Sequence, residues 1–399
     1  MKKKILFVAE AVSLAHVARP SVLARMLDRE RYELVFASNG QYALCTEGLD
    51  AERYAIDSIS AATFLQRLAV GDPVYTEREL AEYVEADLRM LKTVRPDVVI
   101  GDFRLSLSIA ARLSGVHLMS LCNAYWSPYA RETTMMAPDL PMARLLGFPL
   151  FDQIFRLAWP LASRYHCRAI NKVRQRYGLG KVESLRHYYC DGDTVLYADT
   201  ESLAPTVDRP ASHHYIGPVV WSPDVALPAW WGAALADPRP RVYISLGSTG
   251  AVDMLPAIIE ACVAEDFVCL VATAGRGAFG SDSPQVFCAS FLPGNLAAEA
   301  ADLVICNGGS PSSHQALMAG TPVLSVCSNL DQVLNMGTIT RAGAGLMMRA
   351  SEFKFSRARL ALLSLIQTGF RQAARKIQED FEGNDPERVI SSLLDRALG

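Results

Sequence analysis

The stretch that decides the fold runs from Asn307 to Leu317 and reads Asn-Gly-Gly-Ser-Pro-Ser-Ser-His-Gln-Ala-Leu. It follows an apolar segment, 302–306, that has the composition of a buried strand. A glycine pair between a strand and a helix lets the backbone approach a ligand closely, because no Cβ stands in the way. The helix that follows presents unpaired N–H groups and a partial positive charge at its start. The stretch therefore predicts a strand–helix unit with a binding site for a diphosphate.

A second polar pair follows the next apolar strand, 322–326. Asp331 and Gln332 come a few residues after that strand ends. Neighbouring parallel strands end at the same edge of a sheet, so we expect this pair to reach the edge that carries Gly308 and Gly309. A carboxylate and an amide suit the hydroxyls of a sugar.

The order and spacing of these groups over about thirty residues resemble the donor-binding signature of nucleotide-sugar glycosyltransferases, the family that contains UDP-sugar transferases and macrolide transferases. Two positions differ from that signature. Asn307 stands where the family usually has a histidine, and Gln315 stands where it usually has a glutamate. Both side chains can still form hydrogen bonds, but neither carries the usual charge.

Composition sets the broad class. The chain has 399 residues, half of them hydrophobic, which is enough for about two domains. The net charge of −3 gives no reason to expect nucleic acid as a partner. Nine scattered cysteines without Cys-x-x-Cys pairs predict reduced thiols in a cytoplasmic protein rather than disulfides or a zinc site.

The N-terminus imitates a signal peptide. Glu10 interrupts its apolar run after five residues, which is shorter than the roughly 7–15 residues of a signal core. We expect a first strand there instead. No apolar run approaches the ~20 residues of a membrane span.

Strand-like and helix-like runs alternate in both halves, which predicts an α/β protein with parallel sheets covered on both faces. In the first half the expected strands are 4–9, 33–37, 96–102 and 117–121, with helices at 20–30, 77–93 and 105–114. In the second half they are 241–246, 267–273, 302–306 and 322–326, with a helix at 256–265. Neither half has Gly-x-Gly-x-x-Gly after its first strand, which disfavours a dinucleotide dehydrogenase.

The resemblance implies two Rossmann-like domains facing across a cleft, the GT-B architecture. We place an acceptor-binding domain at 1–217, a linker rich in Pro and Trp at 218–240, a donor-binding domain at 241–384, and a last helix at 385–399 that crosses back to the N-terminal domain.

His16 is the candidate base. It follows the first strand by a short loop, so it lies at the carboxyl edge of the sheet, and an imidazole can accept a proton near neutral pH. The segment 13–20 is similar to the family's Gly-His-x-x-Pro region, where the histidine is the base. Ala15 replaces the glycine, and one extra residue separates His16 from Pro20. The alternative is a histidine that only packs or caps the helix.

Asp102 is the candidate partner of His16. It ends the strand 96–102, and a carboxylate there would orient the imidazole and stabilise the imidazolium. The run 96–103 looks like the family segment that supplies this aspartate. An N-cap for the following helix is the alternative role, and the two are compatible.

The leaving diphosphate needs hydrogen-bond donors and positive helix ends, and the resemblance supplies them without a metal or other cofactor. The donor-binding residues that it implies are Gly247, Ser248, Thr249, Phe291, Leu292, Asn307, Gly308, Gly309, Ser310, Ser312, Gln315, Asp331 and Gln332. An ordinary strand-to-helix turn at 247–249 and a core role for Phe291 are the alternatives.

Asp191-Gly192-Asp193 spells an Asp-x-Asp, a pattern that can hold a divalent cation. The triplet precedes a strand at 194–197, and Asp-Gly is common turn chemistry. We interpret it as a turn.

The acceptor would bind in the aromatic and Met-rich region 125–177, with Trp126, Tyr129, Met135 and Met136 as the candidate residues. Such a lining suits an apolar or lipid-like alcohol. Basic residues in the same region could also contact an anionic membrane surface, which would place the protein at the inner membrane face. A buried helix pair with a solvated basic face explains the same composition.

The expected function is therefore metal-independent, inverting transfer of a hexosyl group from a UDP- or dTDP-sugar to an acceptor hydroxyl, with His16 as base and Asp102 as its support. Two alternatives keep the fold: a sugar-nucleotide epimerase and a non-catalytic nucleotide-sugar-binding protein.

Overall fold

The computed structural model describes residues 2–131, 135–276 and 283–399. They form two compact units. The first comprises Met1–Thr133, Ile154–Val219 and Asn384–Gly399, and the second comprises Thr134–Gln153 and Val220–Gly383.

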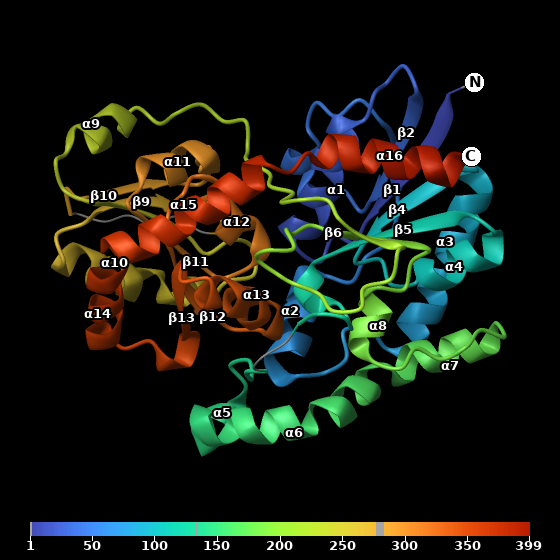
Figure 1. Ribbon diagram of the computed structural model, residues 1–399, viewed down its shortest axis with the longest axis horizontal. Helices are drawn as coiled ribbons and strands as arrows, with labels where there is room; N and C mark the ends of the chain where they lie inside the picture. Colours follow the sequence, from blue (N-terminus) through green and yellow to red (C-terminus); the bar gives the residue numbers. More distant parts are fainter. Residues whose placement is uncertain (1, 132–134, 277–282) are drawn as a thin grey trace. The chain divides into compact units, whose positions relative to one another are not determined.

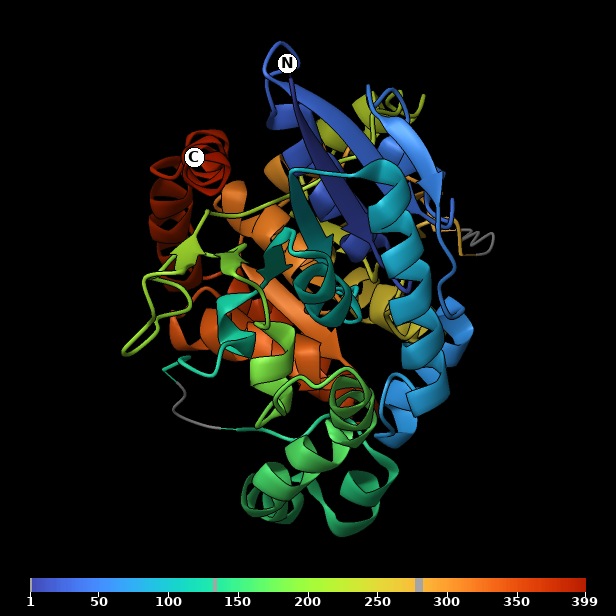
Figure 2. The same ribbon diagram turned by 90° about the vertical axis from the view of Figure 1, so that its right-hand side faces the viewer.

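The first unit is built on a seven-stranded parallel sheet (Figures 1 and 2). Its strands, in spatial order, are β3 (Glu52–Ala55), β2 (Tyr32–Ser38), β1 (Lys3–Ala9), β4 (Val98–Asp102), β5 (His117–Cys122), β6 (Thr194–Tyr197) and β7 (His213–Tyr215). The strand order reverses between β1 and β4, which pair directly, with Ala9 opposite Asp102. Ligands of such sheets bind outside the carboxyl ends of the strands at this switch point.

The first unit also contains seven helices among the described residues. They are α1 (Leu14–Met26), α2 (Ala61–Val70), α3 (Glu77–Val94), α4 (Leu107–Ser114), α7 (Arg168–Arg176), α8 (Leu185–Tyr189) and α16 (Pro386–Leu398), with 3-10 turns η1 (Ala43–Thr46) and η2 (Ala124–Trp126). Helix α3 begins at a capping box in which Thr76 and Glu79 satisfy each other's backbone amides. Helix α16 contacts α1 and β4.

The second unit has a six-stranded parallel sheet with the same kind of switch. Its spatial order is β10 (Val286–Ala289), β9 (Val268–Ala272), β8 (Arg241–Ser245), β11 (Leu303–Cys306), β12 (Val323–Cys327) and β13 (Gly345–Arg349). The order reverses between β8 and β11, where Ser245 lies opposite Cys306. Each half of the chain therefore offers one switch point to a ligand.

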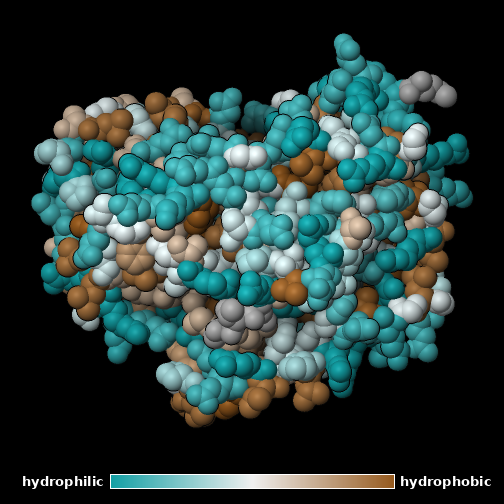
Figure 3. Space-filling model, in the orientation of Figure 1, coloured by the Kyte–Doolittle hydropathy of each residue, from teal (hydrophilic) through white to brown (hydrophobic). Residues whose placement is uncertain are grey.

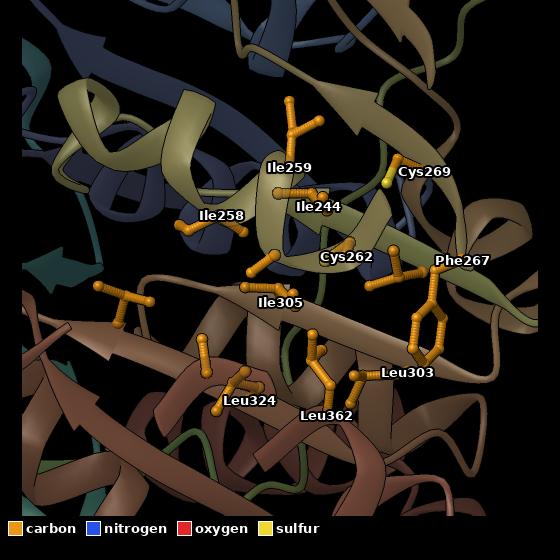
Figure 4. Packing of buried hydrophobic residues seen from close by; sticks show 14 of the residues in the cluster. Ile244, Ile258, Ile259, Cys262, Phe267, Cys269, Leu303, Ile305, Leu324 and Leu362 are labelled. Atoms are coloured by element: carbon orange, nitrogen blue, oxygen red, sulfur yellow. The ribbon is translucent and has the colours of Figure 1, made fainter. Parts of the chain in front are cut away.

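The helices of the second unit are α5 (Pro141–Leu146), α9 (Trp231–Ala236), α10 (Leu255–Ala264), α11 (Gly294–Ala300), α12 (Ser310–Met318), α13 (Leu330–Arg341), α14 (Phe355–Leu365) and α15 (Thr368–Glu382), with 3-10 turns η3 (Val252–Met254) and η4 (Ala350–Glu352). A core of β-branched and leucine side chains joins α10 and α14 to the sheet (Figure 4). Ile244, Ile305 and Leu324 on adjacent strands face this core and are excluded from water.

One further helix, α6 (Phe148–His166), is continuous across the division of the chain: it begins in the second unit and ends in the first.

The predicted α/β class with two parallel sheets is confirmed, but three local predictions differ from the structure. The helix expected at 20–30 is α1 at Leu14–Met26, with Pro20 inside it. Proline lacks an amide hydrogen, so Pro20 leaves the carbonyl of His16 without its usual helical donor. The expected linker 218–240 joins the second unit from Val220 and contains α9.

The third difference concerns residues 134–153, which we expected in the first domain but which belong to the second unit. Arg349 explains this, because its guanidinium donates to the carbonyl of Ala137 (3.0 Å) and to Asp152 (2.6 Å). Asp139 accepts from the amide and hydroxyl of Ser351 at 2.7 and 2.6 Å. These contacts span some two hundred residues of sequence, so local pattern could not reveal them.

Candidate active site

His16 and Asp102 meet at the switch point of the first sheet. His16 lies in the first turn of α1, directly after β1, and Asp102 is the last residue of β4. The Nδ1 atom of His16 lies 2.8 Å from Oδ1 of Asp102. The Asp102 side chain is fully buried, whereas His16 keeps 17% of its side chain exposed. The imidazole thus has one side fixed by protein and another open to a substrate.

Asp102 is shared with a second cation, Arg19, one helical turn after His16. Arg19 donates from Nη2 to Oδ1 of Asp102 at 2.7 Å and from Nε to Oδ2 at 2.9 Å. Its Nη1 donates to Asn123 at 2.6 Å. Burial alone would raise the pKa of the Asp102 carboxyl, but the charge of Arg19 and the bonds from His16 and Arg19 outweigh it and lower that pKa. Asp102 is therefore ionised when the pair operates.

The shared carboxylate also fixes the tautomer of His16. An ionised carboxylate only accepts hydrogen bonds, so Nδ1 of His16 carries the proton that faces Asp102. Nη2 of Arg19 lies 3.3 Å from the same Nδ1, and two donors cannot bond to each other. In the neutral imidazole, Nε2 is then the nitrogen without a proton and the one that can accept one.

An aromatic cluster packs against one face of this imidazole ring. Phe103 stacks on His16 with ring centroids 4.5 Å apart and planes within 13°. Tyr189 packs on Phe103 at 5.4 Å, and Trp126 meets Tyr189 edge-on at 4.8 Å. Phe103 adopts a left-handed backbone conformation, φ +59°. Such a conformation is costly for a bulky residue and is typical of functional sites.

The predicted acceptor residues divide into three places. Trp126 belongs to the aromatic cluster beside His16. Tyr129 packs edge-on against His213 at 5.5 Å. Met135 and Met136 belong to the second unit, where Met135 is buried. Of the four, Trp126 is the one that the structure links to the imidazole.

A buried ionic network braces the strand ends beside the site. Arg104 donates to Glu10 at 2.8 Å and pairs with Asp87 at 2.9 Å, with its guanidinium 3.8 Å from the ring of Tyr83. Glu10 follows β1, and its amide donates to the carbonyl of Asp102. Burial raises the pKa of Glu10 above its ordinary value, although Arg104 opposes that shift. The network fixes the ends of β1 and β4 to α3.

The predicted donor residues of the second unit gather at its own switch point. Asn307, directly after β11, donates from Nδ2 to the hydroxyl of Thr249 at 3.1 Å and accepts from the amide of Gly309 at 3.0 Å. The 247–249 loop follows β8, and a Cβ placed on Gly247 would lie 3.9 Å from the hydroxyl of Ser312. Asn307 therefore joins the two loops that were predicted to hold a diphosphate.

Gly308 holds a position that only glycine can occupy. Its φ is +85°, and a Cβ there would lie 2.6 Å from the sulfur of Cys327. Its carbonyl accepts from Nδ2 of Asn335 at 2.7 Å. Helix α12 begins right after this turn, with Gly309 as N-cap, so the first amides of α12, including those of Ser310 and Ser312, point at the same edge.

Asp331 and Gln332 open helix α13. Gln332 is buried and completes a capping box, because its Oε1 accepts from the amides of Ser328 (2.7 Å) and Asn329 (3.2 Å). Its Nε2 has no partner among the described residues. Asp331 is half-buried in the first turn of α13. The Oε1 atom of Gln332 thus holds the start of the helix, while its buried Nε2 is left without a partner among the described residues.

Gln315 lies on α12 and is nearly buried. It donates from Nε2 to the carbonyl of Trp221 at 3.3 Å and lies 3.5 Å from Asn295. Leu292 is buried, while Phe291 is half-buried with its ring 3.5 Å from a Cβ placed on Gly275. A neutral amide at position 315 can thus satisfy a backbone carbonyl, which the glutamate common in the family could not do.

The Asp191–Asp193 segment forms a turn with both carboxylates occupied. Asp191 pairs with Arg112 and Arg174, and Asp193 accepts from the amide of Leu118 at 2.8 Å. The described residues contain no group of three or more His, Cys, Asp or Glu that could hold a metal ion. All nine cysteines are free thiols.

Sequence reasoning missed Arg19, Phe103 as a stacking partner, and Tyr189. Arg19 follows His16 by three residues, and this spacing places two side chains on the same helix face. That signal was available once the helix was known to start at Leu14. Tyr189 is 86 residues from Phe103 in the chain, and no local pattern indicates their contact.

Comparison with solved structures defines the class of fold. The spinosyn forosaminyltransferase SpnP matches the whole chain with a TM-score of 0.69 at 16% identity, covering 100% of both chains. The spinosyn rhamnosyltransferase SpnG complexed with thymidine diphosphate matches with a TM-score of 0.69 at 19% identity, over 98% of this chain and 99% of that chain. The two parallel-sheet domains therefore have the GT-B glycosyltransferase fold.

Sequence comparison gives the family. Residues 261–395 match the model for the erythromycin biosynthesis protein CIII-like C-terminal domain. A PGL/p-HBAD biosynthesis rhamnosyltransferase of Mycobacterium bovis is 42% identical over 98% of this chain and 88% of its own. A PGL/p-HBAD biosynthesis glycosyltransferase of Mycobacterium tuberculosis is 40% identical over 98% of this chain and 92% of its own. The chain belongs to the UDP-glycosyltransferase family and is a glycosyltransferase.

A further relative has a name that describes it as inactive. A Mycobacterium bovis protein named as an inactive PGL/p-HBAD biosynthesis glycosyltransferase is 41% identical over 65% of this chain and 71% of its own.

Proposed function

We propose that this glycosyltransferase inverts the anomeric centre while it transfers a sugar from a nucleoside diphosphate to the hydroxyl of an apolar acceptor. The observation that carries this proposal is the 2.8 Å contact between His16 and the buried, ionised Asp102. This contact orients the imidazole so that, in its neutral form, the unprotonated Nε2 lies away from the carboxylate, which is the arrangement that a general base needs.

The proposed reaction is a single displacement. Nε2 of His16 removes the proton from the acceptor hydroxyl as the oxygen attacks the anomeric carbon. A new C–O bond forms on one face while the bond to the diphosphate breaks on the other, and the nucleoside diphosphate leaves with that electron pair. Asp102 stabilises the imidazolium that results. A single displacement of this kind gives the opposite anomeric configuration.

The second unit would stabilise the leaving group. The amides at the start of α12 and the 247–249 loop supply neutral donors, and the positive end of the α12 dipole offsets the charge of the diphosphate. The unpartnered Nε2 of Gln332, with Asp331 beside it, would bind sugar hydroxyls. No step in this scheme requires a metal ion.

The names of the relatives narrow the substrates to test. The rhamnosyltransferase of PGL/p-HBAD biosynthesis and the SpnG complex with thymidine diphosphate favour a dTDP-linked deoxy sugar, with UDP-sugars as the alternative. The aromatic cluster around Phe103 favours an acceptor whose hydroxyl sits on an apolar or aromatic body.

The test is a turnover assay with dTDP- and UDP-sugars against a set of phenols and long-chain alcohols, with the product anomer determined by NMR. An inverted glycoside is expected. A product that retains the donor configuration would contradict the single displacement. A donor whose sugar changes without any acceptor would indicate an epimerase, and nucleotide binding without turnover would indicate a binding protein.

A further inference from the structure

Helix α6 carries an apolar stripe that faces water. Leu150, Ile154, Leu157, Leu161 and Tyr165 follow one another at intervals of four, three, four and four residues along this 19-residue helix. At 100° per residue these side chains fall within an arc of about 80°. Their exposed fractions are 51%, 41%, 82%, 69% and 46%. We call these five residues the α6 stripe.

The stripe is not the side by which α6 packs on the protein, because the opposite side of the helix already makes those contacts. Phe148 and Ser163 are buried on that side, and the Ser163 hydroxyl accepts from the amide of Leu185 at 2.8 Å. Phe155 and Trp159 pack together there and are half-buried. A helix on a water-soluble surface normally places polar residues opposite its buried face, so the stripe calls for an apolar environment.

Helix α5, immediately before α6, extends the exposed apolar surface. Met142, Leu145 and Leu146 are exposed by 53%, 78% and 40%. Figure 3 shows hydrophobic atoms in brown gathered at the lower edge, where Figure 1, in the same orientation, draws α5 and α6. Isolated exposed leucines are common on proteins, but a contiguous row is a sign of binding.

The charges next to the stripe are positive. Residues 141–176 contain seven basic side chains and one acidic side chain, Asp152, in a chain whose net charge is −3. Four of these basic side chains pair with acidic groups of other segments: Arg144, Lys172, Arg174 and Arg176. Arg164 flanks the stripe, about 60° from its centre on the helix, and the guanidinium of Arg168 lies over the Tyr165 ring at 5.4 Å. Asp152 is paired with Arg349. Among the described residues, Arg164 and Arg168 make no ion pair, so the Tyr165 end of the stripe carries positive charge that no acidic side chain offsets.

We propose that α6 docks on an anionic lipid bilayer, lying in the plane of the interface with the α6 stripe at the headgroup–acyl boundary and its arginines among the lipid phosphates. Apolar side chains on one face with Arg beside them are the features of such interfacial helices. No helix of the described residues is long and apolar enough to cross a membrane, so the contact is with the surface. The stripe lies on one continuous helix, and its arginines would repel a second copy of the same face.

The test is flotation of the full chain with vesicles of phosphatidylcholine alone or mixed with phosphatidylglycerol, in the absence of donor and acceptor. We expect binding to the anionic vesicles that weakens as salt is raised. The double variant Leu157→Ser/Leu161→Ser should lose binding by about tenfold or more, because two exposed leucines leave the interface. Arg164→Gln/Arg168→Gln should weaken binding roughly tenfold on anionic vesicles only.

Matched controls exist on other helices. Leu360 on α14 is 67% exposed, close to Leu161, and Arg78 on α3 has a side chain 86% exposed. Leu360→Ser and Arg78→Gln should leave vesicle binding unchanged, and circular dichroism should show that every variant keeps its helices.

Three results would overturn the proposal. The wild-type chain could fail to float with anionic vesicles, or the control variants could lose as much binding as the α6 variants. Analytical ultracentrifugation could instead show a dimer that Leu157→Ser/Leu161→Ser dissociates while vesicles do not bind, which would assign the stripe to a contact between copies. Because flotation needs no catalysis, failure here would leave the proposed transfer reaction standing.

Discussion

Replacing His16 by Ala should separate catalysis from folding, and the structure sets the size of both effects. General base catalysis typically contributes ~10²–10⁴-fold, so we expect kcat to fall by that factor. Asp102 keeps its two bonds from Arg19, at 2.7 and 2.9 Å, so no buried carboxylate is left without a partner. The chain should therefore remain folded.

The loss of stability comes from two contacts of the imidazole. One is a hydrogen bond to a charged acceptor, worth about 1.5–3 kcal/mol. The other is the stack on Phe103, worth about 0.5–1.5 kcal/mol. Because His16 is partly exposed and water can replace it, the lower values apply, and we expect a loss of about 2 kcal/mol from the 5–15 kcal/mol that is typical of a folded domain.

The assay pairs steady-state kinetics with urea unfolding and with calorimetry of dTDP or UDP binding. His117→Ala is the control, since His117 also makes one side-chain hydrogen bond, to Thr194 at 2.9 Å, but lies at the amino end of β5. Nucleotide affinity should be unchanged in both variants. The reasoning would be refuted if His16→Ala kept more than about a tenth of wild-type kcat, or if His117→Ala lost as much.

Three further predictions follow from single side chains. Arg19→Met leaves the buried carboxylate of Asp102 with one partner, so urea unfolding should show that the free energy of unfolding falls by about 3–5 kcal/mol. Much of this loss should be recovered in Arg19→Met/Asp102→Asn. A loss below about 1 kcal/mol in Arg19→Met would contradict this reasoning. Gly308→Ala would force alanine into a φ of +85° and bring its Cβ to 2.6 Å from the sulfur of Cys327, so it should weaken nucleotide binding and lower stability by about 2–4 kcal/mol. Gly337→Ala is the control, because a Cβ at Gly337 on α13 meets no atom within 4 Å, and it should change neither property. Burial, helped by the charge of Arg209, lowers the pKa of His213 to about 4, whereas a histidine in the unfolded chain has a pKa of ~6.5. The free energy of unfolding should therefore fall as the pH drops from about 6.5 to 4. A His213→Gln variant that showed the same dependence of stability on pH would refute this.

The sequence predicted where strands end better than it predicted which side chains contact one another. Strand β11 and the glycine turn at Gly308 were predicted because an apolar run followed by paired glycines has few other uses. His16 and Asp102 were predicted as a pair from their places at strand ends and from the family resemblance, and the structure places Nδ1 of His16 2.8 Å from Oδ1 of Asp102. The predicted start of helix α1, at Pro20, is too late: proline is common at the start of a helix, but here the residues from Leu14 onward are already helical.

By itself, the sequence determined the features that depend on neighbours along the chain: two parallel sheets, a glycine turn after β11 and a histidine after β1. Only the tertiary structure decided which groups share a charge or a face. It assigned Asp102 to both His16 and Arg19, returned residues 134–153 to the second unit through Arg349, and left the leucines of α6 facing water. The reason is that strand period and turn chemistry act within a few residues, whereas ion pairs, ring stacking and exposure depend on segments that folding brings together from distant positions.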